Sequence, residues 1–548
     1  MAAASQPFAS ASAPRNKRKA GLRFSRFPMV AMLLIGTGVL CAAAAEIRVN
    51  NATDLKTRTS TLQPGDTLIA ESGTYTLTTW NIQNISGTRT NWITIRAESN
   101  AVIRGTATSA NVIEIQNVHY LNFAGFEIVT TAATNYSIDG IKFSASASSY
   151  LTFDRLYIHG MGGNGMSLFA PEASFITLRN SEIASVAGSG LYWGYPSNNI
   201  VHDVLIENNY IHHCPVNPLS DVGYGIQFKG WGYRARIVDN VLHDVGGTAR
   251  SGLIVYYGRK PLQGDVPDDM NIVRGNVLWN CRSEGITAMS DALIENNIVF
   301  DAVVGINLQT YNDGSFSGPN YVENLVVRNN TAYRCSSACI SVPSAGWTPV
   351  GSNVALTGNA AYRTNSSQAA FSGSGGAARI AGNVRYGTGL STGVTVGNGL
   401  ADFRSVVATG TVPNLDFYPS ANSALTNKVM SPQDWPGADF NGSARPYAAA
   451  VDAGAYERAA TNNPGSTIQA ASKPPIAPTP PVIQQIVCAD ATNYFVCWPY
   501  TVKWTEVEFV RSLDASNWVS LAGPLYATNS TVALPASASN GFFRIRLE

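Results

Sequence analysis

Short stretches of alternating apolar and variable residues recur through the middle of the chain. Each follows a Gly-apolar-x-apolar pattern, and both apolar positions are hydrophobic in every copy. An alternation with a period of two is typical of a β-strand that buries one face. We therefore expect one short strand per copy, beginning at Gly140, Gly165, Gly190, Gly225, Gly252, Gly285 and Gly305.

A second pattern follows most of these strands and ends on a turn position. Copies such as VLIENNYI and ALIENNIV recur every 21 to 36 residues, the spacing of a solenoid coil. Asparagine tolerates the left-handed backbone of a tight turn, and its amide can bond the same residue of the next coil. We expect an asparagine ladder, with a second strand before the turn and a third after it. The turn positions are Phe126, Leu156, Ser181, Asn209, Asn240, Asn276, Asn297, Asn330, Asn359 and Asn383.

Three short parallel strands per coil, with no room for helices between them, specify an all-β fold, the right-handed parallel β-helix. Over residues 46–457 the sequence resembles the pectin-lyase-like β-helix proteins. The opening segments LQPGDTLIAESGTYTLTTW and SGTRTNWITIRAE resemble those of the chondroitinase B and alginate lyase family. The closing segments LDFYPSANSALTNK, DFNGSARP and VDAGAYE resemble the end of bacterial β-helix proteins, which implies a segment that covers the last open coil.

Residues 1–45 have the pattern of a secretory signal peptide. Basic residues precede an apolar run over residues 29–41, and the alanines at 42–45 provide a cleavage site. The alternative, a retained membrane anchor, is disfavoured because about 13 apolar residues are too few for a span of roughly 20. We expect export to the extracellular space or to the bacterial cell surface or periplasm, with no membrane span in the mature chain.

The C-terminal region is expected to form a separate small domain. A linker rich in Pro, Ala and Ser, residues 458–483, cannot form a core. Residues 484–548 resemble the small β-sandwich found at the C-terminus of secreted bacterial proteins. Cys488 and Cys497 flank an expected hairpin there, and a disulfide between them suits an oxidising compartment. Three other cysteines share an inward column of the β-helix and are expected to be small core residues, too far apart to pair: Cys214, Cys281 and Cys335.

Composition and charge limit the classes of function. The chain has 49 Gly and only 13% charged residues, which favours turn-rich β structure over helices. Without the signal region it carries 31 basic residues against 36 acidic ones. This composition fits no nucleic-acid-binding class, and an acidic polymer would require a local basic patch. Basic residues do concentrate on two consecutive coils, at Lys229, Arg234, Arg236, Arg250, Arg259 and Lys260.

The outward positions of the predicted strands identify a candidate site. Adjacent coils are about 4.8 Å apart, so Lys229 and Tyr256 should be neighbours on an outer face. Residues 212–224, 257–270 and 310–323 flank the same strands and are expected to form the walls of a groove. The expected substrate-binding residues are Tyr192, Gln227, Trp231, Arg259, Lys260, Asn307 and Gln309.

A basic groove with aromatic and amide side chains suits a uronate-containing polysaccharide, whose carboxylates it can pair with. Cleavage of such a chain by β-elimination requires a base for the proton next to the carboxylate and an acid for the leaving oxygen. A lysine serves as the base when nearby cations and desolvation lower its pKa, and a tyrosine serves as the acid. Lys229 and Tyr256 are the candidate catalytic pair.

The family resemblance implies the same lysine. In chondroitinase B-like lyases a strand ending in Val-Lys supplies the base, and IQFK places Lys229 at that position. Those enzymes carry an arginine on the next coil, where LIVYYG places Tyr256, so Arg259 or Lys260 would have to take its part. The acidic cluster that binds calcium in those lyases is not evident on the preceding strands, so we expect no cofactor.

Other interpretations stay open. Outward lysines are often only solvated, and outward tyrosines often only stack across coils. One histidine column, at His159, His212 and His243, is expected to be a surface stack rather than a metal site. A monomeric polysaccharide lyase is the favoured function, ahead of a non-catalytic glycan-binding or adhesive surface protein. A glycoside hydrolase is third, because the two carboxylates that it requires are offered only on loops or turns, by Asp265, Asp268, Asp269, Glu284 and Asp313.

Overall fold

The computed structural model describes most of the chain from residue 44 onward. The predicted signal segment up to residue 43, Trp231, Arg259 and Lys260 lie outside the described residues. The described ranges are 44–131, 138–194, 200–216, 222–230, 232–256, 270–310, 322–343, 353–409, 415–431, 434–447 and 449–458, together with seven strands beyond residue 466, whose bounds are given below.

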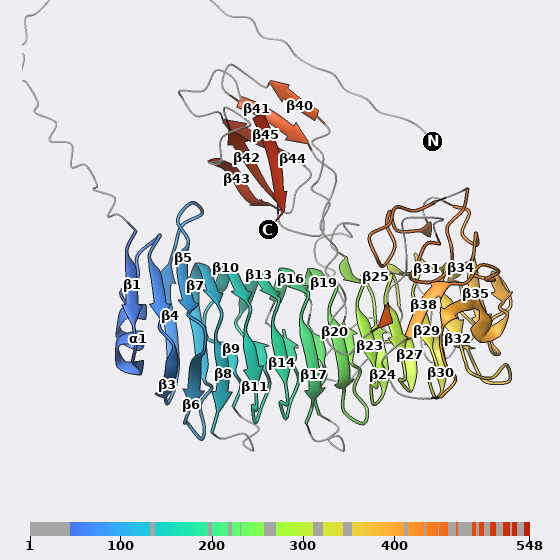
Figure 1. Cartoon of the computed structure of the whole chain (residues 1–548), viewed down its shortest axis with the longest axis horizontal. Helices are drawn as coiled ribbons and strands as arrows, with labels where there is room; N and C mark the ends of the chain where they lie inside the picture. The colour runs from blue at the N-terminus through green and yellow to red at the C-terminus, as the bar shows by residue number, and fades with distance from the viewer. Residues whose placement is uncertain are drawn as a thin grey trace, which may run out of the picture. The chain divides into compact units, whose positions relative to one another are not determined.

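Residues 46–396 wind into a right-handed parallel β-helix, as the sequence predicts (Figure 1). Each complete coil contributes one strand to each of three series, and each strand pairs in parallel with its counterpart in the next coil. The first series contains β9 (Ile141–Phe143), β12 (Met166–Leu168), β15 (Leu191–Trp193), β18 (Ile226–Phe228), β21 (Leu253–Val255), β24 (Glu284–Ala288), β27 (Val304–Leu308), β30 (Ala338–Ser341) and β33 (Phe371–Ser372).

The second series contains β10 (Ser148–Asp154), β13 (Glu172–Arg179), β16 (Ile200–Glu207), β19 (Tyr233–Val238), β22 (Asn271–Arg274), β25 (Ala292–Glu295), β28 (Leu325–Arg328), β31 (Val354–Thr357) and β34 (Arg379–Ala381). The N-terminal coils add β1 (Glu46–Val49), β2 (Thr67–Ala70), β4 (Trp80–Ser86), β5 (Ile93–Ala97) and β7 (Ile113–Ala124), and β7 spans the first and second series.

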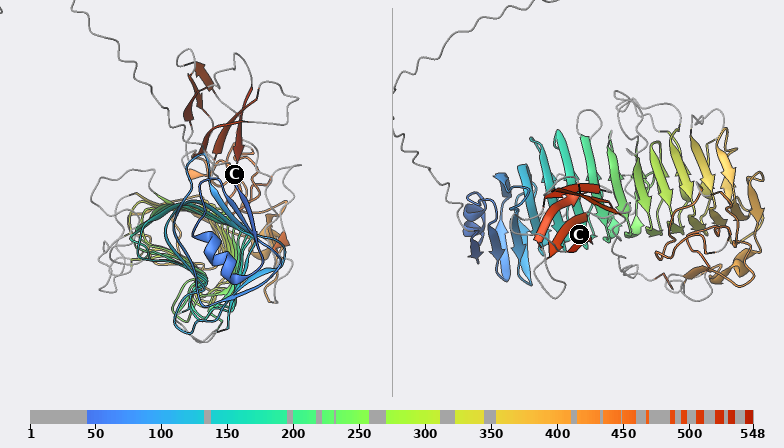
Figure 2. Two further views of the ribbon diagram at one scale, coloured as in Figure 1. Left: turned by 90° about the vertical axis from the view of Figure 1, so that its left-hand side faces the viewer. Right: turned by 90° about the horizontal axis from the view of Figure 1, so that it is seen from above.

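The third series follows the asparagine turns. It contains β3 (Gly73–Leu77), β6 (Ala101–Gly105), β8 (Glu127–Thr130), β11 (Tyr157–His159), β14 (Glu182–Ala184), β17 (Tyr210–Cys214), β20 (Val241–Val245), β23 (Val277–Trp279), β26 (Ile298–Phe300), β29 (Thr331–Tyr333), β32 (Ala360–Tyr362), β35 (Asn383–Tyr386) and β36 (Val394–Val396). Figure 2 shows the coils end-on, with the three strand series around one interior.

The glycine that starts each first-series strand is required by a close approach between coils. A Cβ added at Gly190 would lie 2.6 Å from the Gly225 carbonyl oxygen and 2.7 Å from Cγ2 of Ile211. Only a residue without a side chain permits this approach. Similar clashes with the next coil's backbone would arise at Gly140, Gly165, Gly225, Gly285 and Gly305.

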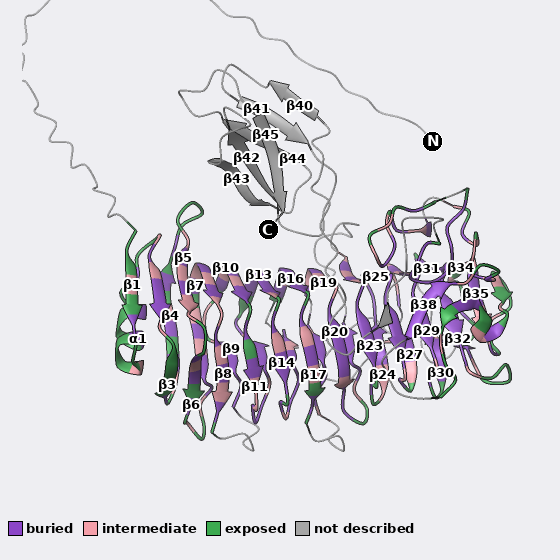
Figure 3. Ribbon diagram, viewed as in Figure 1, coloured by how far each residue is buried: buried purple, intermediate pink, exposed green. Residues whose placement is uncertain are grey.

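The two inward columns of the first series are confirmed. The register pairs Leu191 with Ile226 and Trp193 with Phe228, and the same offsets continue through neighbouring coils. These side chains belong to one core cluster that runs along the β-helix. Figure 3 shows the resulting band of buried residues along the strands. The burial of apolar area in successive coils is the main stabilising contribution to such a fold.

The predicted asparagine ladder is also confirmed. In each successive pair, one side-chain amide donates to the next side-chain oxygen at 2.9 to 3.0 Å. The same side-chain oxygen also accepts the backbone N–H of the ladder asparagine in the preceding coil. The oxygen and the NH₂ group of each buried amide therefore both have hydrogen-bond partners. The ladder residues are Asn209, Asn240, Asn276, Asn297, Asn330, Asn359 and Asn383, all buried.

The left-handed residue of this turn differs from the expectation. It is the residue before the ladder asparagine, with φ of 53° at Asn208, 57° at Asp239 and 67° at Gly275. The ladder side chain has to turn inward to reach the next coil, so its neighbour makes the change of direction. Asn, Asp and Gly adopt this backbone at low cost, which explains their frequency at that preceding position.

A short helix covers the first coil. Helix α1 (Ala52–Thr59) lies across the end of the solenoid in the end-on view of Figure 2. The side chain of Asn51 accepts the Asp54 backbone N–H at 2.9 Å and so caps the helix. Leu55 is fully buried beneath the helix, and Trp80 Nε1 donates to the Thr59 hydroxyl at 3.2 Å. The helix thereby shields the open edge of the first coil.

The closing segment packs on the side of the β-helix, and its cover of the last coil stays a prediction. It contains the 3₁₀ helix η2 (Gly399–Asp402), β37 (Phe403–Ser405) and β38 (Leu415–Pro419). Phe417 lies 5.7 Å from the ring of Phe300 and 5.5 Å from that of Tyr333, and Phe403 meets Tyr362. These third-series side chains point outward and are large and apolar, so they require a cover. The segment shields them from water.

The cysteines of the β-helix behave as expected. Cys214, Cys281 and Cys335 are buried and free, as is Cys339. Burial raises the pKa of the Cys214 thiol to about 12, because the apolar interior disfavours the thiolate. These residues are small members of the core.

The C-terminal region forms two antiparallel three-stranded sheets. One contains β40 (Gln485–Cys488), β41 (Asn493–Cys497) and β44 (Asn529–Ala533), and the other contains β42 (Thr505–Val510), β43 (Val519–Leu525) and β45 (Phe542–Leu547). Within the expected linker, β39 (Thr467–Ile468) pairs with β38. The hairpin register pairs Cys488 with Tyr494 and Cys497 with Gln485. The side chains of both cysteines lie outside the described residues, so the disulfide between them stays a prediction.

Candidate functional site

The outward positions of the first series line up across coils as predicted. In five successive coils the register aligns one outward residue from each strand, in the order Tyr192, Gln227, Ile254, Thr287 and Asn307. Residues with the same offset from the starting glycine become neighbours about 4.8 Å apart. Three predicted substrate-binding residues, Tyr192, Gln227 and Asn307, therefore occupy one column.

A row of cationic and aromatic side chains crosses these strands. We call it the cation–aromatic strip, and it consists of Lys142, Phe169, Tyr192, Lys229 and Tyr256. Lys142 Nζ lies 4.9 Å from the centre of the Phe169 ring, which meets the Tyr192 ring edge-on at 5.0 Å. Lys229 Nζ lies 5.8 Å from the centre of the Tyr192 ring and 5.7 Å from that of Tyr256. These contacts are within the range of cation–π attraction and link five successive coils.

Lys229 contacts the rings of both tyrosines of this strip. The strand β18 ends at Phe228, and Gly230 turns the chain away with φ of 79°, so Lys229 stands at the strand's exit. Its side chain is half-buried, and Nζ donates to the Tyr192 hydroxyl at 3.5 Å. The predicted proximity of Lys229 and Tyr256 is confirmed. Lys229 also has a polar contact with Tyr192, on the preceding coil.

Gln227 and Tyr256 point away from the core but are covered. Each is only 2% exposed, and Gln227 Nε2 donates to the Tyr256 hydroxyl at 3.3 Å. Tyr256 packs in a second apolar cluster with Tyr224, Ile254 and Met289. A groove was expected here, and the structure shows buried side chains at these two positions. Most of the expected groove walls, residues 257–270 and 310–323, lie outside the described residues. The half-buried part of the candidate site that contains Lys229 and Tyr192 lies beside them.

The other predicted binding residues are separated from Lys229. Asn307 on β27 is 7% exposed and Gln309 is half-buried, and they lie three coils, or about 14 Å, further along the axis. Three further predicted residues, Trp231, Arg259 and Lys260, are outside the described part of the chain. Of the predicted site residues that are described, Tyr192, Gln227, Lys229 and Tyr256 come together.

The basic cluster is divided between two faces. Arg234 on β19 makes a two-pronged contact with Asp203 of β16, with Nε and Nη2 each 2.6 Å from a carboxylate oxygen. The backbone at Arg234 is left-handed, with φ of 52°, and the side chain points toward Asp203 on the neighbouring second-series strand. Arg250 lies with its guanidinium 5.8 Å from the centre of the Tyr224 ring. Among the described residues, the positive charge at the strip therefore comes from its members Lys142 and Lys229, with Arg250 on the coil after Lys229.

A buried carboxyl near the strip was missed by sequence reasoning. Asp139 is 3% exposed and accepts a hydrogen bond from the Ser167 hydroxyl at 2.5 Å, while Lys142 Nζ lies 3.9 Å away. Burial raises the pKa of the Asp139 carboxyl, although Ser167, Asn164 and Lys142 oppose this effect. The sequence did carry a signal, because a polar residue precedes several of the strand-initiating glycines. These residues form a second polar ladder, in which Asp139 accepts the Asn164 backbone N–H at 2.7 Å.

These features define a protein of the parallel β-helix class with a polar and aromatic outer strip. The sequence model of the family described as "Right handed beta helix region" matches residues 45–261 and 139–320, and the chain belongs to this family, whose fold is pectin-lyase-like. No curated protein sequence matches the chain significantly.

Several solved structures are similar in fold at low sequence identity. An alginate lyase from Paenibacillus sp. str. FPU-7 is 19% identical, over 50% of this chain and 92% of that one, with a TM-score of 0.35. A mannuronic acid specific polysaccharide family 6 lyase from human gut microbiota is 15% identical, over 62% and 86%, with a TM-score of 0.42. A mannuronan C-5 epimerase A-module from Azotobacter vinelandii is 16% identical, over 61% and 85%, with a TM-score of 0.40. In the described part of the chain, no helix has the length and apolar character needed to cross a membrane.

Proposed function

We propose that this protein is exported and engages a uronate-containing polysaccharide on the outer face of the first series, where it cleaves the chain by β-elimination. The observation that carries the proposal is the position of Lys229 Nζ, 3.5 Å from the Tyr192 hydroxyl and facing the rings of Tyr192 and Tyr256. At this separation the lysine can act as the base and the phenol as the acid on the same sugar ring.

In the proposed reaction, neutral Lys229 takes the proton from the carbon next to the substrate carboxylate. A carbon–carbon double bond then forms as the glycosidic carbon–oxygen bond breaks, and a tyrosine hydroxyl gives its proton to the leaving oxygen. The sequence favoured Tyr256 as this acid. Tyr192 fits the part better, because its hydroxyl lies beside Lys229 Nζ, whereas the Tyr256 hydroxyl is bonded to Gln227 and its side chain is buried.

A non-catalytic glycan-binding function is the second candidate. It is favoured by the burial of Gln227, Tyr256 and Asn307, which leaves a narrower polar surface than the sequence suggested. Aromatic side chains with adjacent cations bind anionic sugars without any chemistry. A glycoside hydrolase is the third candidate, and the raised pKa of the buried Asp139 carboxyl is the feature that supports it.

The test is to incubate the full-length protein with alginate, pectate and chondroitin sulfate. The ultraviolet absorbance of the unsaturated product and the number of new reducing ends are both measured. Elimination produces both signals, hydrolysis produces reducing ends alone, and binding without cleavage is seen only by affinity electrophoresis in gels that contain the polymer. If none of the uronate polymers gives the absorbance signal, the lyase proposal is wrong.

The residue assignment is tested with three variants. Lys229→Ala should lower the elimination rate at least about 100-fold, because it removes the base, and Tyr192→Phe should lower it by a comparable factor. Lys142→Ala is the matched control: Lys142 also lies over an aromatic ring of the strip, but three coils from Lys229. Retained activity in Lys229→Ala, or an equal loss in Lys142→Ala, would refute the assignment.

A further inference from the structure

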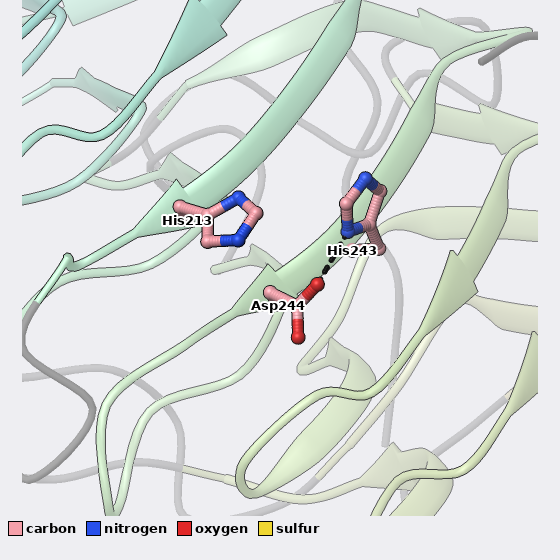
Figure 4. Close-up of side chains that lie close together, drawn as sticks. All are labelled: His213, His243 and Asp244. Carbon is pink, nitrogen blue, oxygen red and sulfur yellow. Dashed lines mark hydrogen bonds and ion pairs between the residues drawn. The ribbon is translucent and has the colours of Figure 1, made fainter. Parts of the chain in front are cut away.

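Three side chains with metal-binding atoms converge on the outer side of the third series, away from the cation–aromatic strip. They are His213, His243 and Asp244, and one ligand atom of each lies within 4.8 Å of the others (Figure 4). His213 is exposed, Asp244 is half-buried and His243 is 7% exposed. The group is therefore anchored in the protein on one side and open to water on the other.

The backbone explains why adjacent residues can share this face. In a regular strand His243 and Asp244 would point to opposite sides. Asp244 has a φ of 52°, which turns it outward beside His243, and Val245 then returns to the core with no exposed area. His213 has a φ of 53° at the equivalent position of the preceding coil. Two successive coils thus repeat the same bend and bring three outward side chains together.

The expected histidine stack forms part of this arrangement. His212 and His243 are paired in register and stack with ring centres 5.2 Å apart and planes 8° apart. His159 is two coils away, separated from His212 by Ala184. All three histidines therefore share the predicted column, and of these three His212 and His243 stack on each other. The prediction did not include His213 and Asp244.

Neighbouring groups hold the three side chains in place. The Tyr210 hydroxyl lies 2.6 Å from His243 Nε2, and the Trp279 ring stacks on the His243 ring at 4.6 Å. On its other side, His243 Nδ1 donates to Asp244 Oδ2 at 2.6 Å. Asp244 Oδ1 accepts the side-chain amide of Asn280, and His212 Nδ1 lies 2.8 Å from His213 Nδ1. Such outer contacts orient imidazole and carboxylate ligands in metal sites.

We infer that His213, His243 and Asp244 form a binding site for a divalent transition-metal ion, and that zinc suits it best. Two imidazoles and one carboxylate are typical zinc ligands, and three protein ligands leave a fourth position for water. Metal–ligand bonds of about 2.0–2.2 Å place tetrahedral ligand atoms roughly 3.3–3.6 Å apart. This separation lies between the 2.6 Å hydrogen bond and the 4.8 Å limit of the group. On binding, the ion takes the place of the proton on His243 Nδ1, and the imidazole, which stays neutral, carries its proton on Nε2 beside the Tyr210 hydroxyl.

The ion would join two coils of the solenoid. His213 belongs to β17, whereas His243 and Asp244 belong to β20, so one ion adds a link between strands that are also held by backbone hydrogen bonds and by the contacts of His243 with Tyr210 and His212. The bridge lies where the chain leaves β17 on its way to β18, the strand that precedes Lys229. Because only the folded chain presents the three ligands together, the ion stabilises the folded protein.

The inference is tested on the full-length protein after removal of metals with a chelator. Isothermal titration with zinc chloride should give one site per chain, and cobalt(II) should give the intense visible absorption of tetrahedral coordination. His213→Asn and Asp244→Asn should each weaken zinc binding at least about tenfold, and both should reduce the rise in melting temperature that zinc causes. Asparagine is chosen because it tolerates the left-handed backbone at both positions.

His159→Asn is the matched control. His159 lies on the same series and contacts Glu127 at 3.0 Å, but it does not belong to the group of three. This variant should bind zinc as the wild type does, and circular dichroism should show all the variants folded. Zinc binding by the wild type that is no tighter than binding by His213→Asn, or cobalt absorption typical of six-coordinate ions, would overturn the inference.

Discussion

Replacing Asn276 by alanine should destabilise the protein strongly. Its buried side chain makes four hydrogen bonds within the ladder. The amide donates to the Ile237 carbonyl at 2.8 Å and to Asn297 Oδ1 at 3.0 Å, and Oδ1 accepts the backbone and side-chain N–H groups of Asn240, each at 3.0 Å. At about 0.5–1.5 kcal/mol for each bond, the loss amounts to about 2–6 kcal/mol. The upper half of this range is expected, because the Asn240 backbone N–H is left buried without its acceptor.

The measurement is the free energy of unfolding from urea titrations followed by circular dichroism and tryptophan fluorescence. Asn208→Gly is the matched control, since Asn208 is exposed and belongs to the equivalent turn two coils earlier, where its side-chain amide donates to the Asn180 side chain at 2.7 Å. Glycine keeps the left-handed backbone, so this variant should lose about 1 kcal/mol or less. If Asn276→Ala moves the unfolding midpoint no further than Asn208→Gly, the ladder does not stabilise the fold in the way argued.

Two further predictions concern buried packing. Glu295 is fully buried between Arg274 and Arg328, and although burial favours its protonated form, the two guanidinium groups hold its pKa below the ordinary value. Glu295→Gln should cost about 3–5 kcal/mol at neutral pH. A pKa that is lower in the folded protein stabilises the fold at pH values above the unfolded-state pKa of about 4.3. The difference in unfolding free energy between wild type and Glu295→Gln, measured by urea titration, should therefore shrink as the pH falls below about 4.3. A difference that stays constant with pH would contradict this. Gly190→Ala should lower the melting temperature by several degrees, because the added Cβ would lie 2.6 Å from the Gly225 carbonyl oxygen. Gly437→Ala is the control: Gly437 is exposed, and an added Cβ would have no atom within 4 Å, so the melting temperature should not change.

The repeating parts of the molecule were predictable because each coil obeys the same constraints as its neighbours. The starting glycines fix the register, and the register then determines which side chains meet across coils. This is why the inward columns, the asparagine ladder, the buried cysteines and the contact between Lys229 and Tyr256 followed from the sequence. Backbone geometry at single residues did not follow, because a left-handed residue such as Asp244 breaks the alternation on which the prediction rests.

The spacing of residues in the sequence also did not predict which outward-pointing side chains are covered by other parts of the chain. Alternation says that Gln227 and Tyr256 point away from the core, but it does not say what packs over them. The closing segment illustrates the same point on the third series, where Phe417 covers Phe300 and Tyr333 from more than 80 positions further along the chain. Long-range cover of this kind is decided by tertiary packing rather than by local pattern.

This distinction changes which tyrosine should be tested first. If orientation alone decided function, Tyr256 would be the natural partner of Lys229, since its ring lies on the next coil, 5.7 Å from Lys229 Nζ. A proton donor must also reach the substrate, and a side chain that is 2% exposed and bonded to Gln227 does so only after its surroundings move. Tyr192 is half-buried and already within 3.5 Å of Lys229 Nζ, so it requires no such movement. A larger loss of elimination activity in Tyr256→Phe than in Tyr192→Phe would therefore show that the cover over Tyr256 opens when the polysaccharide binds.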